Sequence, residues 1–231
     1  MALIITYFIA HFMTNTVHNL SLQNTIFNQF VAELRDVSIQ KDSMRFRRNL
    51  ERMGEVMSYE ISKTMVFETR DTQTPLGIAQ TSHITSQPVV ATILRAGLPM
   101  HLGVLNYFDK AENAFISAYR RHHKDNTFDI HVEYVSSPNL DGKIVILCDP
   151  MIATGGSIVL AYKALLAKGT PKHTHIISAI SSKQGVDFVK ANMPTQNFTI
   201  WCGAIDEELT AHAYIVPGLG DAGDLAFGQK I

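Results

Sequence analysis

The stretch Ile144-Val145-Ile146-Leu147-Cys148-Asp149-Pro150-Met151-Ile152-Ala153-Thr154-Gly155-Gly156-Ser157 decides the fold of this chain. Its first four residues are aliphatic, which is typical of a strand covered on both faces of a parallel sheet. Ser157 to Lys168 has helical periodicity, and Gly169 stands where a helix-ending glycine belongs. The stretch therefore predicts a strand, a short loop and a helix in succession.

The loop between this strand and helix has the composition of a phosphate-binding site. Residues 153–157 come at the amino end of the helix, where free N–H groups and the helix dipole favour an anion. Gly155 and Gly156 permit close backbone approach, and Thr154 and Ser157 add hydroxyl donors. The Lys of a Walker A loop and the G-x-G-x-x-G spacing of a dinucleotide site are both missing. We expect the loop to bind a phosphate monoester; the alternative is an ordinary tight turn.

Asp149, directly before the loop, indicates which phosphate monoester is bound. Its carboxylate can accept hydrogen bonds from two ribose hydroxyls while the loop holds the 5-phosphate. This combination resembles the ribose-phosphate motif of phosphoribosyltransferases, in which most members carry two adjacent acids; Cys148 takes the first place here. A single acid followed by Pro is similar to the uracil phosphoribosyltransferase variant. The resemblance implies that 5-phosphoribosyl 1-diphosphate is bound by Asp149, Pro150, Met151, Ile152, Ala153, Thr154, Gly155, Gly156 and Ser157.

The composition bounds the class of protein. The chain has 231 residues, of which 46% are hydrophobic and 18% charged, and this predicts one globular α/β domain. A net charge of −1 gives no attraction to nucleic acid or to an anionic membrane. Cys148 and Cys202 lie in apolar runs, so we expect buried free thiols in a reducing compartment, the cytoplasm.

The first residues differ from the rest of the chain. Met1 to Met13 is apolar but too short to span a bilayer, and it lacks the basic start and small-residue cleavage site of a signal peptide. We treat residues 1–20 as an atypical extension of the single domain 1–231. A docking segment and a wrongly chosen upstream start codon remain alternative explanations.

A long helix is expected from Asp42 to Lys63, after the residues 28–37 that lead into it. One stripe at helical spacing should face a core or a subunit contact: Phe46, Leu50, Met53 and Met57. The basic residues lie mostly off that stripe, and a solvated basic face is favoured over a ligand site: Arg45, Arg47, Arg48 and Arg52. Pro75 to Ala79 predicts a turn into a short strand.

Two arginines follow predicted strands. Val89 to Leu94 is a buried strand that ends at Arg95-Ala96-Gly97, before a helix over Leu98 to Phe108. Open α/β sheets bind ligands at the carboxyl ends of their strands, and a cation beside a glycine suits pyrophosphate. Arg120 follows a strand over Ala114 to Tyr119 and begins a basic run that ends at Lys124. For both arginines a plain loop position is the alternative.

The rest of the chain predicts further strands and helices. Alternating residues suggest a half-exposed β-hairpin or flap: Phe128, Ile130, Val132 and Tyr134. Strands over His175 to Ile180 and Phe198 to Cys202 enclose a short helix over Gly185 to Ala191, with His173 and His175 at a strand edge. Strands separated by helices imply βαβ units, so we expect an α/β fold with a mainly parallel sheet flanked by helices.

The C-terminal run from Tyr214 to Asp224 is rich in small and turn-forming residues and predicts an irregular loop. Tyr214 to Gly223 resembles the uracil-binding segment, or hood, of the uracil phosphoribosyltransferase family almost residue for residue. Ile93 to Leu98 looks like the pyrophosphate loop of that family, and Tyr119-Arg120 like its second anion-binding arginine. The resemblance runs from about Asp42 to Lys230 and implies the type I phosphoribosyltransferase fold.

The resemblance implies a reaction in which uracil and 5-phosphoribosyl 1-diphosphate give UMP and diphosphate with Mg²⁺. Arg95 and Arg120 would hold the diphosphate, and Asp221 would serve its Mg²⁺ end. Uracil would be recognised largely through backbone groups of Ile215, Gly220, Asp221 and Ala222. Mg²⁺ would be bound mainly through the substrate, without a dedicated protein site. The partners expected are the two substrates and further copies of the chain in a homodimer or larger homo-oligomer, with no nucleic acid and no membrane.

Two alternatives from other classes stay open. One is an RNA-binding attenuator of pyrimidine genes on the same fold, against which the near-neutral charge and the intact uracil segment argue. The other is a phosphoribosyltransferase for a different base, such as a purine. Residues 121–138 depart from the usual flap sequence of the family, so substrate closure and regulation by GTP or another nucleotide stay open.

Overall fold

A computed structural model of the chain describes residues 16–122 and 128–229, with side chains left undescribed for residues 118–132. The core is one sheet with the strand order β1-β10-β9-β7-β4-β5-β6, and β8 pairs with β9 off this path. The strands are β1 (Thr16–Asn19), β4 (Val89–Leu94), β5 (Glu112–His122), β6 (Phe128–Ser136), β7 (Ile144–Cys148), β8 (Met151–Ile152), β9 (His173–Ser182) and β10 (Phe198–Asp206). Every pairing is parallel except that of β5 with β6, so the expected mainly parallel sheet is confirmed.

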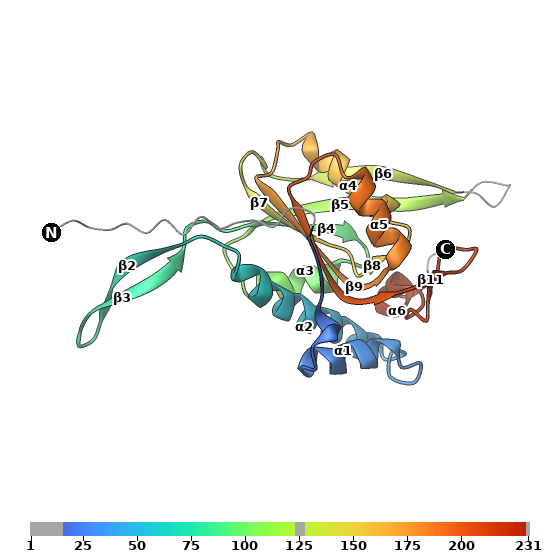
Figure 1. The fold of residues 1–231 in the computed structure, drawn as a ribbon, viewed down its shortest axis with the longest axis horizontal. Helices are drawn as coiled ribbons and strands as arrows, with labels where there is room; N and C mark the ends of the chain where they lie inside the picture. The colour runs from blue at the N-terminus through green and yellow to red at the C-terminus, as the bar shows by residue number, and fades with distance from the viewer. Residues whose placement is uncertain (1–15, 123–127, 230–231) are drawn as a thin grey trace.

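Helices cover both faces of this sheet (Figure 1). One face packs against α1 (Ile26–Arg35), α2 (Ser43–Ser62), α3 (Leu98–Leu105) and α6 (Ala222–Phe227). The other face packs against α4 (Gly156–Leu166) and α5 (Lys183–Asn192). Because the central strands are covered on both sides, all residues of β7 and β9 are buried, as the aliphatic run of β7 predicts.

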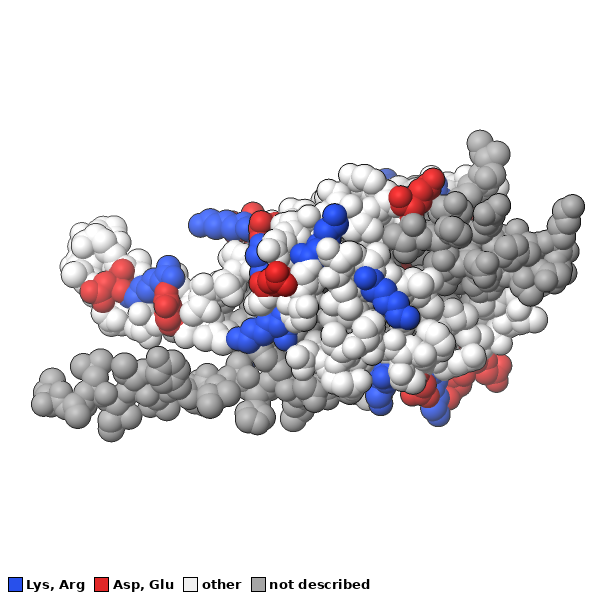
Figure 2. Space-filling model, turned by 90° about the horizontal axis from the view of Figure 1, so that it is seen from above, with Lys and Arg blue, Asp and Glu red and all other residues white. Residues whose placement is uncertain are grey.

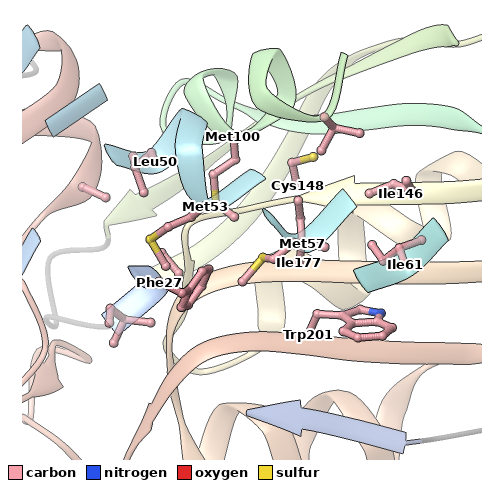
Figure 3. Packing of buried hydrophobic residues seen from close by; sticks show 14 of the residues in the cluster. Phe27, Leu50, Met53, Met57, Ile61, Met100, Ile146, Cys148, Ile177 and Trp201 are labelled. Atoms are coloured by element: carbon pink, nitrogen blue, oxygen red, sulfur yellow. The ribbon is translucent and has the colours of Figure 1, made fainter. Parts of the chain in front are cut away.

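The apolar stripe of α2 supplies much of the first layer. Leu50, Met53 and Met57 are fully buried, and they pack toward strand residues that include Ile146, Ile177 and Trp201 (Figure 3). The predicted core-facing stripe is confirmed. Truncating one of these side chains to Ala should cost about 2–5 kcal/mol, because a close-packed core does not refill the cavity.

The basic residues of α2 are not simply solvated. Arg45 pairs with Glu33, and Arg48 pairs with Glu51 and Glu55. Two more contact other elements: Arg47 Nη1 donates to the Ala226 carbonyl at 2.6 Å, and Arg52 lies over the Phe30 ring. The prediction of a solvated basic face is therefore only partly right, because ion pairs and packing hold these side chains.

A two-stranded hairpin outside the main sheet projects from the body of the molecule (Figure 1). β2 (Phe67–Thr74) and β3 (Gly77–Ile84) pair antiparallel over their whole length, around a turn at Pro75 and Leu76. The sequence predicted the turn and the following strand but not the preceding one, because β2 is polar and shows little alternation. None of the described residues of β2 and β3 is buried. We call this hairpin the β2–β3 arm.

His173 and His175 lie in the interior, not at a strand edge as predicted. β9 lies between β7 and β10, so both side chains are buried, and Trp201 Nε1 donates to His175 Nδ1 at 3.1 Å. Burial lowers the pKa of His173 to about 4 and that of His175 to about 3. Both histidines are therefore neutral at pH 7.

Cys148 and Cys202 are buried free thiols, as expected. Burial raises the pKa of both, to about 12 for Cys202. Within the described part of the chain, no helix has the length and apolar character that crossing a membrane requires.

Candidate functional site

The site lies where β4 and β7 end. These strands are parallel neighbours with Thr92 opposite Cys148, so Arg95 and Asp149 leave the sheet at the same edge. β5 lies on one side of β4, whereas the chain continues from β7 through β9 and β10 on the other side. This edge is a topological switch point, the place where open α/β sheets bind ligands.

The predicted phosphate loop leads from this edge into α4. Gly155 is the N-cap of α4 with φ +80°, a left-handed conformation that favours glycine, and Gly156 N–H donates to Thr154 Oγ1 at 3.5 Å. Just before the loop, Met151 and Ile152 form β8, a pairing that the sequence did not indicate. The N–H of Asp149 donates to the Ile177 carbonyl at 3.2 Å, which ties the acid to β9.

The amino end of α5 contacts the phosphate loop and helps to hold it in place. Ser182, the N-cap of α5, donates through Oγ to the Ala153 carbonyl at 2.5 Å and accepts from Gly185 N–H at 2.8 Å. A Cβ at Gly185 would lie 2.2 Å from the Ala153 carbonyl oxygen, so only glycine fits there. Neither residue was predicted to belong to the site. The sequence signal for them is a serine before a helix, with a glycine in the first turn of that helix.

Arg95 follows β4 and reaches the C-terminal segment. Its Nη2 donates to the Gly228 carbonyl at 3.0 Å and lies 3.5 Å from Asp224 Oδ1. The neighbouring Gly97 is packed so closely that a Cβ would lie 2.4 Å from Thr92 Oγ1. The peptide between Leu94 and Arg95 is cis.

Arg120 belongs to β5, which continues to His122; the prediction that the strand ends at Tyr119 is wrong. Pairing with β6 extends the strand, and Arg120 lies opposite Ile130. The hairpin expected from the alternating residues of β6 is present and extends beyond the sheet on the side where α6 lies (Figure 1). The side chain of Arg120 lies outside the described residues, as do residues 123–127, so the rest of the predicted basic run is untested.

The C-terminal segment is more regular than the sequence predicted. β11 (Glu208–Leu209) pairs with β12 (Ile215–Val216), and α6 begins at Ala222. The prediction that this run contains no helix is wrong, because Asp221 caps α6 by accepting from Asp224 N–H at 3.0 Å. Ile215 and Ala222 are buried, whereas Gly220 is exposed with φ +94°.

Comparison with known proteins decides the family. A family model described as uracil phosphoribosyltransferase matches residues 21–229. A uracil phosphoribosyltransferase of Porphyromonas gingivalis is 57% identical over 215 residues, which cover 93% of this chain and 99% of the relative. One of Methanothermobacter thermautotrophicus is 38% identical over 190 residues, which cover 81% of this chain and 86% of the relative.

The chain belongs to the uracil phosphoribosyltransferase family. This confirms the family, the enzyme class and the transfer of phosphoribosyl to uracil in pyrimidine salvage that the sequence indicated. The solved structure of the AQ2163 protein from Aquifex aeolicus has a TM-score of 0.81 and 28% identity, covering 92% of this chain and 98% of that one. The α/β fold of this chain is thus found in a solved structure over nearly the whole length of both chains.

The predicted site residues include two carboxylates of the kind that suit Mg²⁺. Asp149 follows β7 and Asp221 is the N-cap of α6, and both carry the hard oxygen ligands that Mg²⁺ prefers. The described residues contain no cluster of three or more His, Cys, Asp or Glu side chains arranged to hold a metal. Mg²⁺ usually keeps several waters and is bound through one or two carboxylates plus substrate phosphates, so a larger protein cluster is not required for it.

Proposed function

We propose that the chain transfers the 5-phosphoribosyl group to N1 of uracil, giving UMP and diphosphate, at the edge where β4 and β7 end. The contact that carries the proposal joins Arg95 to the C-terminal segment, at 3.0 Å from the Gly228 carbonyl. It joins the proposed diphosphate-binding loop to the end of α6, the helix that begins at Ala222 of the proposed base-binding segment. Substitution at the anomeric carbon requires that the diphosphate and base sites lie near each other.

The ribose-phosphate end of the donor is assigned to the loop of residues 149–157. Asp149 would accept hydrogen bonds from the ribose hydroxyls, and the cradle from Ala153 to Ser157 would bind the 5-phosphate. Support comes from the left-handed Gly155 at the start of α4, where N–H groups of the first helical turn are available to an anion.

The diphosphate is assigned to Arg95 and Arg120. As the anomeric C–O bond breaks, negative charge develops on the departing diphosphate, and cations placed beforehand stabilise that charge. Mg²⁺, when bound, supplies further stabilisation of the same charge. Asp221 is the residue proposed to face the Mg²⁺–diphosphate end.

Uracil is assigned to Ile215, Gly220, Asp221 and Ala222. Ile215 and Ala222 are anchored in the core, so the backbone between them is held in place. Gly220 is exposed, and a Cβ built on it would meet only Leu225 Cδ1, at 3.9 Å. That open space lets a planar base approach the backbone closely.

One assay tests the two alternative functions, a phosphoribosyltransferase for a different base and an RNA-binding attenuator. Purified enzyme is given the phosphoribosyl donor, Mg²⁺ and either uracil, cytosine, hypoxanthine or orotate, and release of diphosphate is measured. We expect release with uracil alone; release with hypoxanthine instead would identify a purine enzyme. An RNA-binding attenuator without catalytic activity would release none. The basic and acidic side chains are interspersed on the face shown in Figure 2, which does not favour RNA.

A homodimer or larger homo-oligomer is proposed from the β2–β3 arm. An isolated two-stranded hairpin is at best marginally stable in water, and this one exposes Leu76 completely and Ile78 by 67%. A second copy of the chain can cover these side chains. Light scattering should give at least a dimer for the wild type and a smaller species for Leu76→Asp/Ile78→Asp. Val37→Asp, at an exposed apolar residue off the arm, is the control.

We also propose a domain extent and a cellular compartment for the chain. We take residues 1–231 as one domain, since a single sheet lies between the two apolar clusters. Residues 16–19 of the proposed extension pair with β10 as β1. The cytoplasm is the proposed compartment, because buried unpaired thiols suit a reducing environment.

A further inference from the structure

Arg35 and Asp206 form an ion pair that the assigned site does not use. Arg35 is the last residue of α1 and Asp206 the last of β10. Two parallel hydrogen bonds join them: Nη1 to Oδ2 at 2.7 Å and Nη2 to Oδ1 at 2.7 Å. Such a bidentate pair fixes orientation as well as distance.

The pair encloses the backbone of Gly218. Arg35 Nη1 also donates to the Gly218 carbonyl at 3.0 Å, and Gly218 N–H donates to Asp206 Oδ2 at 2.9 Å. Both polar backbone groups of Gly218 are thus bound by the same two side chains. Gly218 has φ +56°, and a Cβ there would lie 2.1 Å from the Ile215 carbonyl oxygen, so the turn is tight and needs glycine.

The charge state of the pair suits this role. Burial alone would raise the pKa of Asp206, but hydrogen bonds from Arg35 and Gly218, with the charge of Arg35, outweigh it and leave the pKa below its usual value. Asp206 is only 8% exposed. It is therefore a buried carboxylate that stays ionised at neutral pH and accepts from Gly218.

Gly218 lies between Ile215 and Gly220, in the middle of the segment assigned to uracil. Recognition through backbone groups depends on their fixed direction, because an amide that rotates loses its hydrogen bond to the base. We propose that Arg35 and Asp206 are positioning residues that set the uracil-binding backbone without touching the base. This inference rests on the proposed assignment of that segment.

The test compares two Arg–carboxylate pairs with buried acids in the full-length enzyme. Asp206→Asn and Arg35→Ala break the pair at Gly218, while Glu33→Gln breaks the pair of Glu33 with Arg45, which also has a buried acid, 7% exposed. Kinetics are measured with uracil and the phosphoribosyl donor varied in turn, and melting temperature is recorded for each variant.

In the first two variants we expect the KM for uracil to rise about tenfold or more, the effect of losing a charge-assisted hydrogen bond. The KM for the donor should change less than about threefold, because the hydrogen bonds of this pair go to Gly218 in the base-binding segment. Glu33→Gln should lower the melting temperature and leave both KM values unchanged. Arg35→Lys keeps the charge but cannot make the bidentate contact of a guanidinium. It should therefore fold normally and show a smaller rise in the uracil KM.

An unchanged uracil KM in an active Arg35→Lys or Asp206→Asn enzyme would overturn the inference alone, and so would equal rises for both substrates. A wild type that releases no diphosphate with uracil would overturn the proposed function and this inference with it. The two failures are therefore distinguishable by the wild-type assay.

Discussion

Arg95 donates a hydrogen bond to the backbone carbonyl of Gly228, with 3.0 Å between Nη2 and oxygen, and it lies 3.5 Å from Asp224. The loop after β4 is thereby joined to the end of α6. If Arg95 binds diphosphate as proposed, the same guanidinium links the donor to the end of α6, the helix that begins at Ala222 of the segment assigned to uracil. Binding of the donor and order in the C-terminal segment are then coupled through one side chain.

Arg95→Ala should raise the KM for the phosphoribosyl donor or lower kcat by roughly tenfold to a hundredfold, because a charge-assisted contact to diphosphate is lost. Initial rates with each substrate varied in turn measure this. Arg48→Ala removes an arginine paired with Glu51 and Glu55 instead, and it should leave both constants unchanged. Arg120→Ala should behave like Arg95→Ala. An effect on uracil affinity alone would place either arginine at the base.

Asp149→Asn should lower kcat far more than it lowers stability. The variant keeps the shape of the side chain but loses the charge that holds the ribose hydroxyls, a loss on the order of 1.5–3 kcal/mol. Cys148 cannot substitute, since it is buried. Kinetics and thermal melting of the purified variant measure the two quantities. Asp141→Asn, an exposed carboxylate that accepts from Thr170 N–H, is the control, and equal kinetics in the two variants would contradict the ribose role.

Gly218 and Gly220 should respond differently to a side chain. Gly220→Val should damage uracil use and leave donor binding intact, because the new side chain enters open space beside the proposed base site. The φ of +94° strains any side chain at Gly220, so a lower melting temperature is expected as well. Gly218→Ala should lower the melting temperature without this open space, because its Cβ would collide with the Ile215 carbonyl. Competition between uracil and cytosine and a melting curve test both. Wild-type discrimination against cytosine should reach about 10⁴, since the wrong base leaves buried polar groups unpaired.

Stability should fall on acidification over two overlapping pH ranges that begin at different values. His173 and His175 have folded pKa values of about 4 and about 3, below their usual 6.5, so the unfolded chain takes up protons first. Their contribution is complete above pH 6.5 and is lost as the pH falls toward 3. Glu33, with a pKa lowered from 4.5 to about 2 by hydrogen bonds from Arg45 and Asn49, loses its contribution only below about pH 4.5.

Melting temperatures between pH 7 and pH 3 measure this. His173→Gln should flatten the curve between pH 6.5 and 4.5, and Glu33→Gln should flatten it only below that range. A His173→Gln curve parallel to the wild type over the upper range would contradict the role of His173.

Local sequence patterns determined the main elements of the fold and the phosphate loop. Four aliphatic residues before Asp149, two glycines after Thr154 and helical periodicity from Ser157 act over a few positions, so they can be recognised without the rest of the chain. The same holds for Arg95 after its strand. Family resemblance in the C-terminal run added the base segment, for which spacing alone indicated only an irregular loop.

Tertiary structure decided what holds these pieces together. Arg35 and Asp206 are 171 positions apart, and no local pattern marks an arginine at a helix end as the partner of a strand-end acid. His175 is polar by type yet lies deep in the sheet, because β10 covers the edge that it would otherwise occupy. Arg120 is in a strand because β6 returns to pair with it. Each outcome depends on a partner that is brought near only when the whole sheet has formed.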